Sequence, residues 1–239
     1  DAPLLEAPQG PVALVVPHAG YVYSGPVAAR AYAGLRPWRS VIRRVVVIGP
    51  AHRVAVRGLA VSSAEGFITP PGMVPVDTDA TARVLAHRHV HVDDAAHGPE
   101  HSIEVQLPFL QRVLDDGWSL VPIVAGSASP TVVADAIADL WAAPDTLVIV
   151  STDLSHYHDV DTARRLDRET AAAIVASAWE RLDGARACGA VPLSGALELV
   201  RRRHERVRLL LLQTSADTVG TVAIEAVASS ARGERVPMG

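Results

Sequence analysis

The sequence predicts a single α/β domain with a mainly parallel or mixed central sheet and helices on both faces. Three observations predict this class: short apolar runs alternate with helical patterns, no linker-like stretch divides the 239 residues, and no internal repeat is visible. Short apolar runs bounded by polar or Gly/Pro residues are typical of strands buried on both faces, as in parallel sheets. A chain of this length can bury a substantial core, so we expect residues 1–239 to form one unit.

The first half of the chain alternates between strands and helices. Pro26 indicates the first turn of a helix, where its missing N–H has no partner to lose, and Asp77 is a suitable helix cap. The expected elements of this half are a strand at 13–16, a helix at 26–35, strands at 45–48 and 59–62, a Pro-rich loop at 69–75 and a helix at 77–86.

The second half continues the alternation. The helical pattern over 103–114 contains Pro108, which removes a backbone hydrogen bond and should kink the helix or start it afresh. The remaining expected elements are strands at 120–124 and 147–150 and helices at 131–141, 162–179 and 192–204. This alternation favours a sheet that helices cover on both sides.

Composition excludes several classes of protein. The net charge of −4 and the pI near 6.2 give no general attraction to nucleic acid or to an anionic membrane. The apolar runs are far shorter than the roughly 20 residues that cross a bilayer, and the sequence shows no basic, apolar leader, so we expect a cytoplasmic protein. There is no lysine for a Schiff base. Cys188 is the only cysteine, which excludes an intramolecular disulfide and a multi-cysteine metal cluster.

Two histidines occupy matching positions in the sequence. His18 ends the segment ALVVPH at 13–18, and His52 ends VVVIGPAH at 45–52, so each follows an expected strand. In an open α/β sheet, ligands bind outside the carboxyl ends of the strands. Either histidine alone could be a hydrogen-bonded structural residue. Two imidazoles in the same context favour a shared metal ion.

Two further segments contain candidate acids and bases. His101 and Glu104 are three residues apart, so on a helix they point to one face and could approach the same pocket; the alternative is an exposed helix start. Asp153 and His156 belong to a polar cluster that follows the expected strand at 147–150. That position suits a general acid or base, although it is also typical of an ordinary polar loop.

Cys188 lies just ahead of an expected helix. The helix dipole and the free N–H groups at such a position favour a thiolate, which is a metal ligand; the alternative is inert packing. A second group of histidines, His87, His89 and His91, alternates as strand neighbours would. No carboxylate or cysteine is suitably spaced with them, so we interpret these three as surface residues.

Five sequence blocks together resemble the Memo family. They are PHAGYVYSG at 17–25, GPAH at 49–52, EHSIEVQLPFL at 100–110, STDLSHYHD at 151–159 and CGAVP at 188–192. Their order and spacing are similar to that family over nearly all of the chain, and most similar to its prokaryotic branch, the AmmeMemoRadiSam system protein B. The family is similar in fold to the class III extradiol dioxygenases, which hold a non-haem ferrous ion with two His and one carboxylate.

The resemblance implies roles for the matching residues. His18, His52 and Cys188 are implied as metal ligands, with the cysteine in place of the carboxylate of the dioxygenases. His156 falls at the position of their catalytic histidine, which acts as an acid or base, and Asp153 is expected to share that catalytic site or to orient the ligands. The remaining matching residues are expected to contact substrate or to support the ligands: Tyr21, Tyr23, His101 and Glu104.

The sequence departs from the family pattern in three places. The chain starts after the short Gly- and Tyr-containing segment with which members usually begin. Ala190 stands where the family generally has arginine, so no contact with an anionic substrate is expected from that position. The segment 214–220 resembles the family, whereas 228–239 does not resemble its usual closing strand.

Three functions are compatible with these features. The resemblance implies a non-haem Fe(II) oxidoreductase similar to the dioxygenases, acting on an unknown small molecule such as a phenol. A thiolate is softer than a carboxylate, so the ligand set also suits Zn, in a zinc-dependent hydrolase, or Cu(I); blue copper is disfavoured because Met73 and Met238 are not closely spaced with Cys188. The third is a non-catalytic metal-binding or interaction module that works beside a radical-SAM protein and an AMMECR1-domain protein.

Overall fold

Valine-rich apolar runs form the centre of one large sheet. The computed structural model describes residues 12–214 and 220–227, and every residue of the runs 45–48 and 147–150 is buried in it. The strands of the large sheet are β1 (Ala13–Val16), β2 (Arg44–Pro50), β3 (Leu59–Val61), β6 (Val90–Val92), β7 (Ser119–Ala125), β8 (Thr146–Ser151), β9 (Arg206–Thr214) and β10 (Gly220–Val227). A separate hairpin consists of β4 (Gly66–Thr69) and β5 (Gly72–Pro75).

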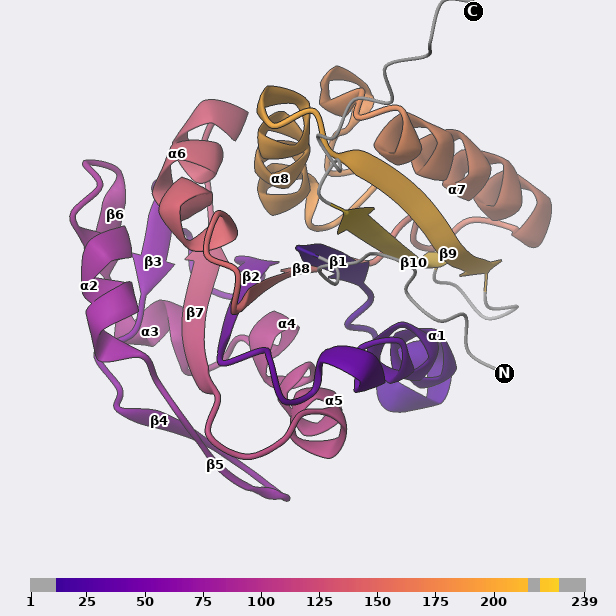
Figure 1. Ribbon diagram of the computed structural model, residues 1–239. Coiled ribbons are helices and arrows are strands. Elements are labelled where there is room, and N and C mark those ends of the chain that lie inside the picture. Colours follow the sequence, from indigo (N-terminus) through magenta and orange to yellow (C-terminus); the bar gives the residue numbers. More distant parts are fainter. Residues whose placement is uncertain (1–11, 215–219, 228–239) are drawn as a thin grey trace, which may run out of the picture.

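The sheet has a parallel centre and mixed edges. The strand order is β6-β3-β7-β2-β8-β1-β10-β9 (Figure 1). The four central strands β7, β2, β8 and β1 are parallel, whereas β3 is antiparallel to β7 and β10 is antiparallel to β1. The carboxyl ends of β1, β2 and β8 therefore lie at the same edge of the sheet, with β8 between the other two.

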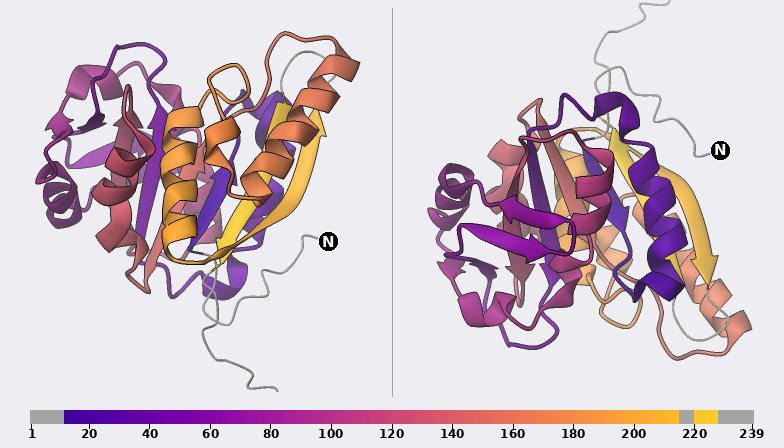
Figure 2. Two further views of the ribbon diagram at one scale, coloured as in Figure 1. Left: turned by 90° about the horizontal axis from the view of Figure 1, so that it is seen from above. Right: turned by 90° about the horizontal axis from the view of Figure 1, so that it is seen from below.

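Helices cover both faces of the sheet (Figure 2). The helices are α1 (Tyr21–Ala33), α2 (Thr78–Leu85), α3 (Asp94–His97), α4 (His101–Glu104), α5 (Leu107–Val113), α6 (Pro130–Trp141), α7 (Val160–Val175) and α8 (Ala190–Arg202), with short 3₁₀ turns η1 (Arg36–Trp38) and η2 (Trp179–Arg181). Alternate residues of β2 point to opposite faces of the sheet. Val46 and Ile48 pack with α2, α6, α7 and α8, whereas Val45 and Val47 pack with α1, α3, α4, α5 and the hairpin. The predicted α/β class is confirmed.

Most predicted elements are confirmed within two or three residues. The expected break at Pro108 is present, because α4 ends at Glu104 and Pro108 lies in the first turn of α5. Asp77 caps α2, as predicted, by accepting a hydrogen bond from the Ala80 N–H at 2.9 Å. Among the described residues, no helix has the length and apolar composition that crossing a membrane requires.

Two helix boundaries were predicted wrongly. The first helix begins at Tyr21 and not at Pro26, since the N–H groups of Tyr23 and Ser24 already bond to the Gly20 carbonyl. Pro26 is tolerated inside α1 because the carbonyl it leaves unpaired belongs to the exposed Val22, where water can reach it. The helix expected at 162–179 ends at Val175, and the chain then turns through Ser177 with φ 51°.

Several strands were not predicted. The Pro-rich segment at 69–75 was expected to be a loop, but it contains the turn and second strand of the β4–β5 hairpin, in which Gly72 has φ 131°. The short strand β6 and the long strands β9 and β10 were also missed. The divergent segment 228–239 lies outside the described residues.

Candidate metal centre

Two histidines meet at the carboxyl edge of the sheet. His18 follows β1 by two residues and His52 follows β2 by two residues, and these strands flank β8. The centroids of the two imidazole rings are 5.2 Å apart. The sheet topology therefore brings together the two side chains that the sequence places in matching contexts.

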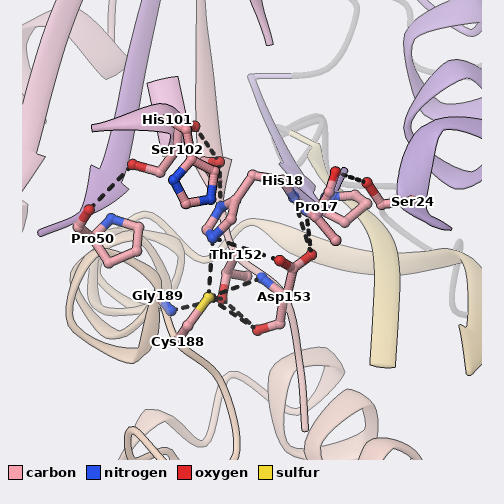
Figure 3. Close-up of polar contacts among 12 residues, drawn as sticks. Pro17, His18, Ser24, Pro50, His101, Ser102, Thr152, Asp153, Cys188 and Gly189 are labelled. Atoms are coloured by element: carbon pink, nitrogen blue, oxygen red, sulfur yellow. Dashed lines mark hydrogen bonds and ion pairs between the residues drawn. The ribbon is translucent and has the colours of Figure 1, made fainter. Parts of the chain in front are cut away.

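Cys188 approaches the same point from the loop before α8. Its Sγ lies 3.2 Å from His18 Nε2 (Figure 3), and one ligand atom each from His18, His52 and Cys188 lie within 4.8 Å of one another. The neighbouring Gly189 permits this approach, since a Cβ there would lie 2.6 Å from the Thr152 side chain and 2.7 Å from the Ser151 carbonyl.

A buried hydrogen-bond network fixes the proton of His18. Ser151 Oγ donates to the Ser102 carbonyl at 2.6 Å and accepts from Gln106 Nε2 at 2.9 Å. Its one proton is thereby used, so His18 Nδ1, 2.8 Å away, must donate to Ser151 Oγ. The lone pair on His18 Nε2 is left facing Cys188. Burial and the neighbouring His52 and His101 lower the pKa of His18 to about 3, which keeps the ring neutral as a metal ligand requires.

Glu100 holds His52 in the corresponding way. Its carboxylate accepts hydrogen bonds from the His52 backbone N–H at 2.7 Å and from His52 Nδ1 at 2.9 Å. The hydrogen bonds to Cys188 and Glu100 raise the pKa of His52 to about 10. In the metal-free protein His52 therefore carries a proton toward Cys188, and a metal ion would take the place of that proton.

The donor set fits a single metal ion. A nitrogen and a sulfur bound to one zinc-like ion at about 2.1 and 2.3 Å lie roughly 3.1–3.6 Å apart at angles of about 90–110°. The observed distance of 3.2 Å between His18 Nε2 and Cys188 Sγ falls in this interval. The second imidazole nitrogen of each histidine donates to a fixed oxygen, an arrangement that commonly orients metal-binding imidazoles.

Asp153 supports the centre from the loop that follows β8, two residues after the strand ends. Its Oδ1 accepts from the backbone N–H groups of His18 and Ala19 at 3.0 and 3.2 Å, and its Oδ2 lies 3.6 Å from His18 Nε2. Its own N–H donates to Cys188 Sγ at 3.2 Å. Burial raises the pKa of the Asp153 carboxyl group. Asp153 thus contacts two of the three predicted ligands, as Figure 3 shows.

The other predicted site residues lie at different distances from this point. His156 is partly exposed. Burial is the largest influence on the pKa values of His18 and Asp153, and an electrostatic interaction with His156 makes a smaller contribution that lowers both. His101 stacks on the His52 ring, with centroids 5.2 Å apart and an interplanar angle of 22°. Its side chain is 39% exposed, so it faces solvent over the site.

Three predicted residues lie at the periphery. Tyr21 and Tyr23 are half-exposed on the first turn of α1, and the Tyr21 hydroxyl donates to the Val105 carbonyl at 3.1 Å. Glu104 is exposed. Burial raises the pKa of Tyr21, and the Glu104 carboxylate adds a smaller contribution in the same direction. The described contacts do not bring Glu104 together with the two imidazole ligands; the carboxylate that contacts His52 is Glu100.

Two supporting residues, Glu100 and Gln106, escaped the sequence reasoning. Ser151 belongs to the polar cluster recognised after the strand at 147–150, but the sequence assigns it no role of its own. Glu100 precedes His101 directly and caps α4 by accepting from the Ser102 N–H, so its position before a short helix was an available signal. Gln106 and Ser151 lie in the recognised sequence blocks, but nothing in the sequence indicates that they meet. Met73 is exposed on β5, and Met238 lies outside the described residues, so no described methionine approaches Cys188 as an axial ligand.

Comparison with known proteins identifies relatives over most of the chain. The family model of the Memo-like protein matches residues 5–231. A MEMO1 family protein of Thermotoga maritima is 40% identical over 223 residues, which cover 89% of this chain and 79% of that protein. A MEMO1 family protein of Aquifex aeolicus is 35% identical over 176 residues, which cover 72% of this chain and only 62% of the relative.

A solved structure has the same fold at low sequence identity. The crystal structure of an uncharacterized protein from Escherichia coli K12 matches with a TM-score of 0.61 and 15% identity, covering 89% of this chain and 98% of that one. This similarity supports the fold alone. The family match includes all five sequence blocks and the three converging ligands, and it shows that the chain belongs to the Memo family.

Proposed function

We propose that the chain is a metal-dependent enzyme that holds one ferrous ion with His18, His52 and Cys188 and oxidises a small phenolic molecule with dioxygen. The observation that carries the proposal is the convergence of these three donors while Ser151 and Glu100 engage the second nitrogen of each imidazole. Three donors on one side of an ion leave coordination positions open on the other. When bound in such a set, ferrous iron supplies positions at which a phenolate and dioxygen can meet.

The protein side chains supply proton transfer and orientation. His156 is the candidate acid or base, because a partly exposed imidazole near Asp153 can take the proton of a phenol and return it. Asp153 positions His18 through the backbone and keeps Cys188 in place through its N–H. His101 lies over His52 on the solvent side, where it can contact a substrate.

The assignment of His156 predicts a separation between metal binding and turnover. His156→Ala should retain the full metal content, because His156 is not among the converging donors, and should lose activity toward an identified substrate. Metal content is measured by elemental analysis after gel filtration. Loss of the metal in a folded variant would instead make His156 a ligand or its support.

Electron paramagnetic resonance tests the iron proposal directly. Protein loaded anaerobically with ferrous iron and exposed to nitric oxide, an oxygen surrogate, should give a high-spin ferrous nitrosyl signal because open positions remain. In Cys188→Ser the signal should change, since an oxygen donor replaces sulfur. Absence of the signal from folded, iron-containing protein would contradict an open ferrous site.

A second candidate function is a zinc-dependent hydrolase. The soft Cys188 thiolate favours it, because two His, one Cys and a water form a recognised catalytic zinc set. Zinc would lower the pKa of a bound water, and His156 or Asp153 would handle protons. Competition between zinc and ferrous iron, followed by turnover assays with and without oxygen, separates the two functions: oxygen-independent turnover by the zinc form favours the hydrolase.

A further inference from the structure

A cavity lies outside the metal centre, lined by residues at the N-terminal end of α6, before β3 and around the start of β6. These three elements are on the left in Figure 1. The volume of the cavity is about 450 Å³. The side chains that give it its character are basic or hydroxyl-bearing: Arg57, Arg88, His89, His91, Ser127 and Ser129. None of its described lining residues belongs to the metal centre. We call this cavity the α6 groove.

The backbone around the α6 groove is fixed by strand pairing. Arg57 forms a parallel bridge with Ser127, and the Gly58 N–H donates to the Ser127 carbonyl at 3.0 Å. Gly58 has φ 78°, and a Cβ there would lie 2.2 Å from the His89 carbonyl. The three segments that line the α6 groove, two of which carry its basic side chains, are therefore held in close contact by hydrogen bonds and by a glycine that no other residue can easily replace.

The charge of the α6 groove is unusual for this chain. The chain has a net charge of −4, yet no described lining residue of the groove is acidic. In the described structure Arg57 and Arg88 have no ion pair, whereas other arginines pair with carboxylates, for example Arg44 with Asp77. The N-terminus of α6, which is the positive end of its helix dipole, adds to the positive potential in the groove. A cavity lined by one sign of charge concentrates ligands of the opposite sign.

We propose that the α6 groove binds a small organic phosphate. A phosphate monoester carries roughly −1.5 to −2 charges near pH 7, which matches two guanidinium groups better than the single charge of a carboxylate does. Arginine forks bind phosphate oxygens with two parallel hydrogen bonds. The volume exceeds that needed for inorganic phosphate and is in the range of small-molecule sites, and Val90 and Val132 supply apolar lining for the organic part.

Isothermal titration with phenyl phosphate tests the proposal. We expect saturable 1:1 binding that Arg57→Gln and Arg88→Gln each weaken by about tenfold or more, since each removes charged hydrogen bonds. Arg83→Gln is the matched control, because Arg83 is an exposed arginine on α2 that does not line the groove. Inorganic phosphate and benzoate are titrated in parallel and should bind more weakly.

Each alternative result has a distinct meaning. Unchanged binding in both groove variants, or no saturable binding at all, would overturn the site. Equal weakening in Arg83→Gln would show attraction to diffuse surface charge. Loss of phenyl phosphate binding in His18→Ala, compared with metal-loaded parent protein, would place the phosphate at the metal centre. Benzoate or inorganic phosphate binding as tightly as phenyl phosphate would overturn the organic phosphate as the ligand class.

Discussion

At the scale of single residues, the three proposed metal ligands should be individually necessary. Replacing His18, His52 or Cys188 with alanine removes one of three converging donors, so metal content should fall strongly while the protein remains folded. Elemental analysis together with circular dichroism measures both quantities. His91→Ala is the control, because His91 is an exposed histidine on β6. A variant that keeps full stoichiometry would remove its residue from the ligand set.

The proton on His18 should depend on a residue that never touches the metal. Ser151 donates its one proton to the Ser102 carbonyl at 2.6 Å, so His18 Nδ1 must donate in its own contact with Ser151 Oγ. Ser151→Ala removes the acceptor of the His18 Nδ1 proton, so metal affinity should fall by about tenfold to a hundredfold, the usual effect of losing such support.

Two measurements separate this positioning effect from a general loss of structure. Nitrogen NMR of metal-free protein should show His18 protonated at Nδ1 in the parent and a mixture of tautomers in Ser151→Ala. Gln111→Leu, on α5 and bonded to the hairpin at Gly72, should leave both tautomer and affinity unchanged. An unchanged tautomer in Ser151→Ala would contradict the network.

The sequence indicates the candidate ligands better than it indicates their supports. His18, His52 and Cys188 could be proposed because strand ends, a helix start and family motifs mark their positions, and the structure brings the three together. Glu104 was considered and Glu100 was missed because helix spacing alone does not reveal where a short helix starts. Since α4 begins at His101, Glu100 is its capping residue and Glu104 its fourth residue, and it is Glu100 that reaches His52. Such contacts depend on the tertiary arrangement.

At the scale of elements, buried central strands were predicted well and edge elements poorly. Runs such as Val45–Ile48 are apolar because both of their faces are covered, so composition alone marks them. The edge strand β6 and the half-exposed β9 lack this signal, since most of their residues reach solvent. The hairpin at 66–75 resembled a loop because its turn chemistry, Pro-Pro-Gly, dominates its composition.

The start of α2 gives a prediction at this scale. Burial would raise the pKa of Asp77, but hydrogen bonds from the Ala80 N–H and from Arg44 outweigh it and lower the pKa below its ordinary value of 3.8. Asp77→Ala should therefore reduce the free energy of unfolding near neutral pH by about 0.5–2 kcal/mol, as loss of a helix cap does. Urea denaturation measures the difference.

The pH dependence of this effect follows from the direction of the shift. Because the folded pKa is lowered, the stabilisation by Asp77 is fully present above the unfolded pKa of 3.8 and is lost as the pH falls through the lower folded value. The difference between parent and Asp77→Ala should thus shrink in acid. Asp79 is an exposed carboxylate in the same helical turn and makes no capping hydrogen bond. Asp79→Ala should therefore reduce the free energy of unfolding by less than Asp77→Ala does. Equal effects for the two variants would assign the stabilisation to helix-end charge alone.

At the scale of the whole molecule, the strand order could not be read from the sequence. The pattern predicted buried strands and covering helices, but it did not indicate that β8 inserts between β1 and β2. This order determines the site, because it places Ser151 and Asp153 between the two histidine-bearing strand ends. Strand order depends on packing between segments that are distant in the chain, so it cannot be predicted from local periodicity.

The same topology predicts that metal binding stabilises the whole fold. The ligands lie at positions 18, 52 and 188, after two different strands and before α8, so a bound ion cross-links segments that separate on unfolding. A metal ion present at about a hundred times its Kd adds roughly 2.7 kcal/mol to the free energy of unfolding. For a domain of this size, that increase raises Tm by about 5–10 °C. Calorimetry of metal-free and anaerobically iron-loaded protein measures the shift. The shift should vanish in Cys188→Ala, whose remaining two donors come from β1 and β2 alone; if it persisted there, the ion would stabilise the protein from some other site.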